Sequence, residues 1–183
     1  MRKSVAFFAL LAACEGYPDQ NEMQQEDAQA SFEHWLDLLV AGKMAEAVQM
    51  MTQSYKSQWT YDRLAEGDPA ALEWRTKLKG NARTDVDLWH GEAEKATSKG
   101  RVPTLPRTVL ADPSLNALLV GYLKDAALEV RYEFTRVKII KVSVDELGVS
   151  ILVHSSRGEP EMYQLVIEGG MWKLDHHKKK EPR

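Results

Sequence analysis

The chain has 183 residues, a formal net charge of −3 at pH 7 and a single cysteine. Hydrophobic residues make up 44% of it and five are tryptophan, a composition that excludes a wholly disordered protein. The mildly acidic balance argues against a general nucleic-acid-binding protein, because such proteins carry a basic excess. One thiol also excludes a framework of disulfide bonds within the chain.

The first residues combine two positive charges with a short apolar run. Arg2 and Lys3 precede residues 5–13, all of which are apolar. This run is too short to cross a bilayer, since a transmembrane helix needs about 20 apolar residues. Positive charges, an apolar stretch and small residues in this order are typical of a secretory signal. Residues 1–13 are therefore predicted to be a targeting segment.

The run ends in Leu11-Ala12-Ala13-Cys14, which resembles the lipobox of bacterial lipoprotein precursors. The resemblance implies cleavage between Ala13 and Cys14, a diacylglyceryl group on the thiol and a third acyl chain on the freed amine. Two or more acyl chains hold a protein firmly on a bilayer, at roughly 0.8 kcal/mol for each buried methylene. We expect a mature chain over residues 14–183, anchored to a membrane outside the cytoplasm.

Two other interpretations of these residues stay open. Ala12 and Cys14 also fit an ordinary signal-peptidase site, and cleavage after Cys14 would release a soluble protein. Alternatively, the apolar run begins an uncleaved helix of a cytosolic protein. Within the lipoprotein resemblance, an Asp after the lipidated cysteine implies retention in the inner membrane of enteric bacteria. Glu15 stands there instead, which implies the periplasmic side of the outer membrane if the host is Gram-negative.

A polar segment follows the cysteine. Residues 14–27 contain Gly16 and Pro18, and we expect them to form a flexible tether. From Glu15 to Asp37 there are seven acidic residues and no Lys or Arg, so anionic lipid headgroups would repel this part of the chain. The tether is expected to hold the folded domain away from the lipid surface.

Apolar residues at helical spacing predict two helices after the tether. The first apolar stripe contains Phe32, Trp35, Leu36, Leu39 and Val40, and the second contains Met44, Ala47, Val48 and Met51. Gly42 ends the first helix, and the second is expected to end near Ser54 or Tyr55. Two amphipathic helices cannot bury both stripes against each other alone, so they require a further surface.

Two Asp-Pro pairs predict the next helices, because Asp is a favoured N-cap and Pro a favoured first helical residue. Asp68-Pro69 begins a helix that ends before Gly80, and Asp112-Pro113 begins a helix that includes Leu123. Residues 83–110 carry several Gly and Pro residues and are expected to form a long, partly ordered excursion. Val86 and Leu88 alternate there as in a short strand.

After Asp125 the hydrophobic period changes from helical to two. Strands are predicted over residues 128–134, 137–144 with a bulge near Ile139 and Ile140, 149–154, 163–167 and 171–175. Gly169-Gly170 suits a tight hairpin, because both residues tolerate positive φ. The pattern predicts an α+β domain over residues 28–176, in which N-terminal helices pack on a curved antiparallel meander of about four strands. A basic tail is expected over residues 177–183.

Helices followed by such a meander resemble the NTF2-like superfamily, which includes SnoaL-like domains. The resemblance is carried by residues 31–47, a helix pair joined at Gly42-Lys43, and by the closing residues 169–175. It implies a cone-shaped fold that holds a small apolar ligand between sheet and helices. Candidate pocket-lining residues, chosen by residue type, are Trp35, Tyr55, Tyr61, Tyr132, His154 and Tyr163.

No spacing of residues indicates an enzyme. Some NTF2-like domains use a carboxylate or His as a base beside a Tyr, and Tyr61 with Asp62 is a candidate by residue type alone. His90, Glu92 and Glu94 would share one face of a strand and could ligate a metal, whereas Gly91 favours a loop or a helix start. We predict no catalytic residues, no metal and no cofactor.

The favoured hypothesis is a non-enzymatic, membrane-anchored module that binds a small apolar ligand or an envelope protein, and no nucleic acid. An extracytoplasmic enzyme using the same pocket, with isomerase-like or hydrolase-like acid–base chemistry, is one alternative. A purely structural envelope lipoprotein is another. A carboxylate beside Tyr or His would favour the enzyme, and an apolar pocket would favour ligand binding. An exposed apolar patch over a filled interior would favour a protein partner.

Overall fold

The computed structural model describes residues 20–96, 102–134, 137–154 and 160–179, with the backbone alone for residues 126–134 and 176–179. Helices come first and strands last, in the order α1 (Gln20–Val40), α2 (Met44–Gln49), α3 (Gln53–Ala65), α4 (Pro69–Lys77), α5 (Gly80–Ala96), α6 (Arg107–Leu110), α7 (Pro113–Phe134), β1 (Lys138–Asp145), β2 (Gly148–His154), β3 (Pro160–Glu168) and β4 (Met171–Lys179).

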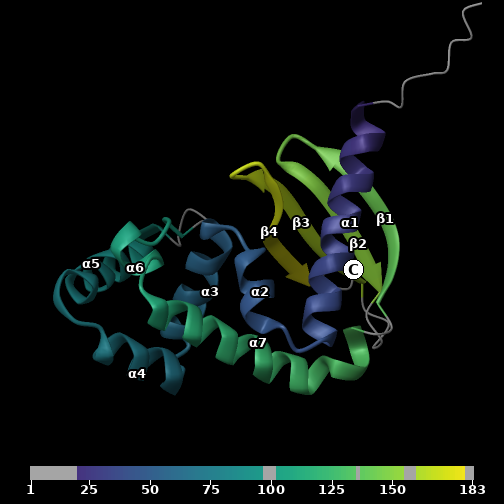
Figure 1. Ribbon diagram of the computed structural model, residues 1–183. Coiled ribbons are helices and arrows are strands. Elements are labelled where there is room, and N and C mark those ends of the chain that lie inside the picture. Colours follow the sequence, from purple (N-terminus) through teal and green to yellow (C-terminus); the bar gives the residue numbers. More distant parts are fainter. Residues whose placement is uncertain (1–19, 97–101, 135–136, 155–159, 180–183) are drawn as a thin grey trace, which may run out of the picture.

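The strands form one open antiparallel sheet in the order β1-β2-β3-β4, so each strand pairs with its neighbours in the sequence. Helix α1 lies across one face of this sheet (Figure 1). The predicted α+β class, with helices packed on a meander of four strands, is confirmed. The predicted bulge in the first strand is confirmed as well, because the register shifts between Ile139 and Lys141.

The core between α1 and the sheet forms because apolar residues recur at helical spacing in α1 and alternate along β2 and β3. Phe32, Trp35 and Leu39 recur at helical spacing and are at most 6% exposed. Alternation in β2 and β3 places Ile151 opposite Tyr163 on the facing side of the sheet. The ring centroids of Phe32 and Tyr163 lie 4.9 Å apart, and those of Trp35 and Tyr163 lie 6.0 Å apart. This layer fixes α1 on the sheet.

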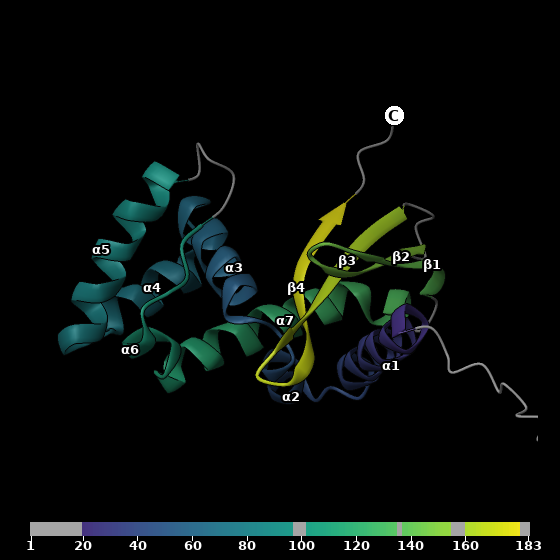
Figure 2. The same ribbon diagram turned by 90° about the horizontal axis from the view of Figure 1, so that it is seen from above.

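Helices α3 to α6 form a second group, here called the helical lobe (residues 53–110), which lies beyond the β4 side of the sheet (Figure 2). Helix α7 contacts α4 in this lobe and also α1 and α2, so it connects the two parts of the domain. Inside the lobe, the buried Ser57 hydroxyl donates to the Gln53 carbonyl at 2.6 Å and accepts from the Leu105 N–H at 2.8 Å. A connecting segment is thereby fixed to α3.

The outer edge of β4 is partly covered by residues 50–52. The Leu174 N–H donates to the Met50 carbonyl at 2.8 Å, and the Thr52 N–H donates to the Leu174 carbonyl at 2.9 Å. Thr52 is also the N-cap of α3, because its hydroxyl accepts from the Tyr55 N–H. The end of α2, the start of α3 and the sheet edge therefore meet at one place.

Three predicted boundaries differ from the structure. Helix α1 begins at Gln20, so residues 20–27 of the predicted tether are helical, whereas residues 14–19 lie outside the described residues. The helix predicted from Met44 to about Ser54 is two helices, because the chain pairs with β4 at Met51. Strand β4 continues to Lys179, so the predicted basic tail over 177–183 begins inside a strand.

Two predicted strands are wrong. Val86 and Leu88 lie in α5, and Gly80 begins that helix, with φ of 56°, instead of ending the preceding one. Much of the predicted excursion over residues 83–110 is therefore helical. Residues 128–134 are the last turns of α7. Their alternation resembles a strand, but Leu, Glu and Arg are good helix formers and the run continues a helix already started at Pro113.

Candidate functional site

The predicted pocket-lining residues lie in different surroundings. Trp35 and Tyr163 are buried in the layer between α1 and the sheet. Tyr55 stacks on Trp59 within α3, with ring centroids 6.2 Å apart. Tyr61 is buried in the helical lobe, where it packs on the rings of Trp89 and His90. His154 is exposed in β2, and Tyr132 belongs to α7, in the part described by its backbone alone.

Tyrosines and carboxylates occur on α3 and on β3. The Tyr163 hydroxyl donates to the Glu161 carboxylate at 3.0 Å. Burial raises the pKa of Tyr55, and the nearby carboxylates of Asp62 and Glu161 raise that pKa further. Asp62 in turn accepts from the Gln58 amide at 2.8 Å. Tyr163 and Glu161, joined by their hydrogen bond on β3, are here called the Tyr-Glu cluster.

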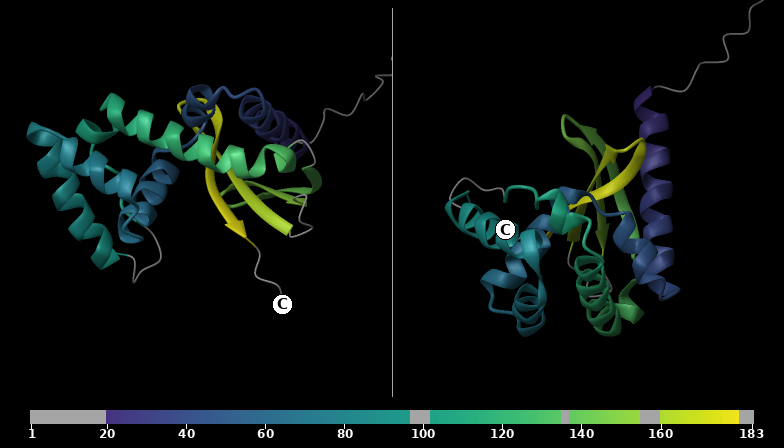
Figure 3. Two further views of the ribbon diagram at one scale, coloured as in Figure 1. Left: turned by 90° about the horizontal axis from the view of Figure 1, so that it is seen from below. Right: turned by 60° about the vertical axis from the view of Figure 1, so that its left-hand side comes forward.

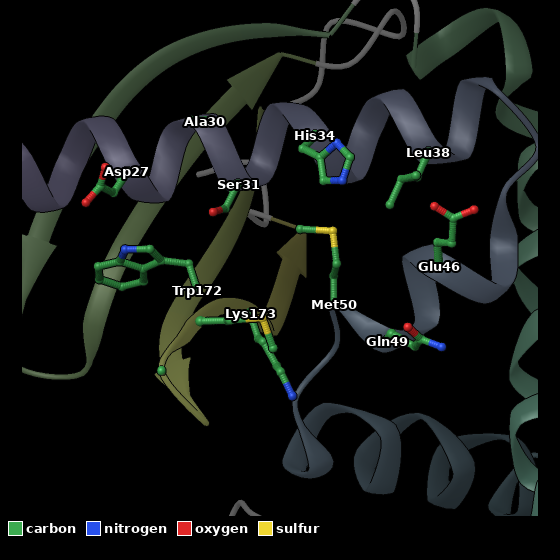
Figure 4. A pocket seen from close by; sticks show the side chains of 12 residues that line it. Asp27, Ala30, Ser31, His34, Leu38, Glu46, Gln49, Met50, Trp172 and Lys173 are labelled. Carbon is green, nitrogen blue, oxygen red and sulfur yellow. The ribbon is translucent and has the colours of Figure 1, made fainter.

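A groove of about 640 Å³ lies between α1, α2 and the hairpin of β3 and β4 (Figure 4). Its volume falls within the range of about 300–1,000 Å³ that small-molecule sites occupy. The lining residues are Asp27, Ala30, Ser31, His34, Leu38, Glu46, Gln49, Met50, Gly170, Met171, Trp172 and Lys173. We call this feature the α1–β4 groove.

Helix α1 forms one wall of the groove through residues at helical spacing. Asp27, Ser31, His34 and Leu38 recur every three or four residues, on a face adjacent to the buried stripe that contains Trp35. Small side chains at positions 30 and 31 leave the space open. The wall follows about three turns of helix, which corresponds to roughly 16 Å at 1.5 Å for each residue.

The opposite side of the groove comes from α2 and from the hairpin. Met50, just beyond α2, extends toward α1, and Trp172 of β4 borders the other end (Figure 4). The hairpin turns at Gly169 and Gly170, which have φ of 64° and 79°. Glycine adopts such angles without strain, so Met171 and Trp172 follow the turn directly. Apolar side chains thereby line the space between the helices and the strand.

Negatively and positively charged side chains are unevenly distributed along the groove. Asp27 and Glu46 place carboxylates toward opposite ends of the α1 wall (Figure 4). Lys173 contributes a positive charge, but its Nζ lies 2.9 Å from a Glu168 carboxylate oxygen. Burial lowers the pKa of Lys56, and the positive charge of Lys173 lowers that pKa further. Glu46 is itself paired with Lys43, 3.5 Å from Nζ to the carboxylate, so the negative charge along α1 comes mainly from Asp27.

Aromatic residue type does not identify this groove, and Trp172 is not among the predicted pocket-lining residues. One signal was present in the sequence. Asp27, Ser31 and His34 place polar residues at helical spacing beside an apolar stripe, which marks a helix face that does not belong to the main core.

Potential metal ligands do not gather in the part of the chain that the structure describes: no group of three or more His, Cys, Asp or Glu side chains occurs there. His90 and Glu94 lie one turn apart on α5, 3.7 Å from Nδ1 to the carboxylate, and not on a strand. Across the same described ranges, every helix lacks the combined length and apolar character needed to cross a bilayer.

Comparisons of the chain with family models, with curated proteins and with solved structures found no match. The lipobox and NTF2-like resemblances therefore depend on the residues of this chain alone.

Proposed function

We propose that this protein is a membrane-anchored, extracytoplasmic binding module that takes a small amphipathic ligand in the α1–β4 groove. The observation that carries the proposal is the groove itself, which combines apolar side chains with a few polar groups in a space of ligand size. The anchor is the lipidated Cys14 that the lipobox resemblance implies. The NTF2-like resemblance agrees with a ligand site between helices and sheet.

The charge of the groove specifies the ligand further. Asp27 favours a positively charged group on the ligand, whereas Glu46 is shared with Lys43. Lys173 does not oppose this preference strongly, because Glu168 neutralises it. The ligand is therefore an apolar molecule with an amine or another cationic group, bound with its apolar part against Met50 and Trp172.

Titration of the full chain with two fragments of the same skeleton, benzylamine and benzoate, tests this function. Benzylamine is expected to bind more tightly. Asp27→Asn is expected to weaken it by up to about fivefold, the value of an exposed ion pair, and to leave benzoate unweakened. Equal binding of both fragments, or tighter binding of benzoate, would contradict the proposed preference.

A blocking variant separates the groove from other surfaces. Ala30→Trp places a large side chain on the exposed groove wall without touching the core, and is expected to weaken benzylamine at least tenfold. Ala45→Trp is the matched control, because Ala45 is exposed on α2 outside the groove lining. Equal loss in both variants would place the binding site elsewhere.

The anchor has its own test, which is independent of the groove. In the native host, Cys14→Ser is expected to move the protein from the membrane fraction to the soluble fraction or to leave it as a full-length precursor. The intact mass of the unsubstituted protein should lack residues 1–13 and include the added lipid. A chain that keeps Met1 and an unmodified thiol would refute the lipoprotein assignment.

An enzyme is the second candidate, and the Tyr-Glu cluster is the observation that favours it. A carboxylate within hydrogen-bond distance of a Tyr hydroxyl is an arrangement suited to proton transfer beside a carbonyl group. Exchange of the α-protons of cyclohexanone in D₂O, followed by NMR, tests this candidate. Exchange that Glu161→Gln abolishes would support it, and exchange at the rate of buffer alone would count against it.

A further inference from the structure

Exposed apolar side chains gather at one end of the domain. Both hairpin tips, β1–β2 and β3–β4, lie at the same end as the start of α1 (Figure 1; Figure 3, right). Leu147, Ile167 and Met171 lie at these tips and are 60–70% exposed, and Met23 in the first turns of α1 is 46% exposed. We call these four residues the tip patch.

Strand register makes the tip patch continuous. Leu147 lies in the β1–β2 turn, and Gly148, which follows it, lies against Leu165 and Val166 of β3, next to Ile167. Ile167 pairs with Trp172 on β4, which is half-buried beside α1. A row of apolar side chains therefore crosses the three strands to the start of α1. Exposed apolar groups that are contiguous in this way mark an interaction surface, whereas isolated ones are common.

The chain outside the described residues indicates what covers this surface. Cys14 precedes the first residue of α1, Gln20, by six positions, and six residues span at most on the order of 20 Å. The apolar residues 5–13 come immediately before Cys14. A lipid on Cys14 would therefore lie within that reach of Gln20, at the end of the domain where the hairpin tips lie.

We infer that the tip patch rests on the lipid bilayer, with Leu147, Ile167 and Met171 in its interfacial region and the helical lobe directed away from it. This inference rests on the proposed anchoring through Cys14. Trp172 next to the patch agrees with it, because Trp is enriched at membrane interfaces. The acyl chains on Cys14 would hold the protein on the bilayer, and the apolar contact would fix its orientation there.

Charge near the patch specifies the kind of lipid surface. Glu22 and Asp27 lie on α1 and Glu146 lies in the β1–β2 turn, whereas Glu168 on β3 is paired with Lys173 at 2.9 Å. Anionic headgroups would repel these carboxylates, whereas zwitterionic headgroups would not. The surface that fits is therefore zwitterionic, and the orientation results from apolar contact and not from charge attraction.

The lipidated protein, with one cysteine added besides Cys14, is placed in phosphatidylcholine vesicles. Fluorescence of a dye on the added cysteine tests the inference. An environment-sensitive dye is attached in Leu147→Cys and in Met171→Cys, and in Leu88→Cys as the control. Leu88 is 65% exposed on α5, in the helical lobe (Figure 1). The dye is expected to shift to shorter wavelength at both tip positions and to be quenched by lipid-borne spin labels, while the Leu88→Cys signal stays unchanged.

The possible failures can be told apart. The chain could co-float with the vesicles while the dyes at both tip positions emit as in water, like the dye at Leu88→Cys. That result would support the anchor and refute the orientation. If the tip dyes shift but lipid spin labels do not quench them, a protein covers the patch and the inference is again refuted. If the chain does not float with the vesicles, the anchoring through Cys14 and the inference based on it both fail.

Discussion

The Thr52 hydroxyl donates a hydrogen bond of 2.8 Å to the Asp175 carboxylate, and both side chains are at most 8% exposed. These residues are 123 positions apart, and their contact joins the N-cap of α3 to the edge strand β4. The same Thr52 oxygen accepts from the Tyr55 N–H at 3.0 Å. One buried hydroxyl therefore links the helical lobe to the sheet beside the α1–β4 groove.

Thr52→Val is expected to lower the free energy of unfolding by about 1–3 kcal/mol, because it removes the donor to a buried carboxylate and a helix cap while preserving shape. Thr52→Ser, which keeps the hydroxyl, is the control and should lose less. Urea denaturation of the full chain measures both. Equal stability of the Val and Ser variants would show that the hydroxyl does not hold these elements together.

Gly148→Ala is expected to cost at least about 2 kcal/mol. A Cβ at this position would lie 2.2 Å from the Leu165 carbonyl oxygen, a backbone atom, and φ is +146°. Overpacking and backbone strain each cost about 1–3 kcal/mol. Gly91→Ala within α5 is the opposite case, because the added Cβ would meet no side chain and no other element within 4 Å. It should raise stability by about 0.5–1 kcal/mol. Thermal unfolding of both variants would contradict this account if their shifts had the same sign.

Ser57→Ala is expected to destabilise the helical lobe by about 1–3 kcal/mol, because it leaves the buried Leu105 N–H without its acceptor. Ser54→Ala on the same helix controls for the change in helix propensity and should have little effect. Hydrogen exchange at the Leu105 amide provides a local measurement. Exchange there should accelerate in Ser57→Ala, and unchanged protection would mean that another group holds this segment.

The ionisation of Asp68 makes the free energy of unfolding depend on pH in the acidic range. Burial alone would raise its pKa, but hydrogen bonds from the Ala71 N–H and the Tyr122 hydroxyl hold the pKa below its ordinary value of 3.8. A carboxyl with a lowered native pKa contributes stability that is complete above pH 3.8 and is lost as the pH falls through the native pKa. Asp68→Asn keeps a good N-cap and should remove this contribution. The difference in unfolding free energy between the two proteins should therefore shrink as the pH falls below 3.8. A constant difference would contradict the assignment.

Helix caps and turns were the features that the sequence predicted best. Asp68-Pro69, Asp112-Pro113 and Gly169-Gly170 each act through local backbone geometry, and the structure has all three where they were expected. Predictions from local sequence were wrong where contacts between distant segments determine the backbone conformation. Residues 50–52 are not helical because they pair with β4, and no residue near them in the sequence predicts this pairing. Residues 128–134 alternate like a strand but continue an existing helix.

The candidate site was harder to predict than the fold. The predicted pocket residues were chosen because they are aromatic, yet Trp35 and Tyr163 are buried in the hydrophobic core. The α1–β4 groove depends instead on the small residues at positions 30 and 31 facing a hairpin more than 130 positions away. Only the docking of α1 on the sheet brings those segments together.

The most direct test of the binding function is a residue-resolved NMR titration of the full chain with benzylamine. The account predicts saturable shifts at the backbone amides of Ala30 and His34 and at the Trp172 indole N–H, with Leu88 and Leu72 unmoved. Shifts scattered over the surface, or confined to residues outside the α1–β4 groove, would contradict it.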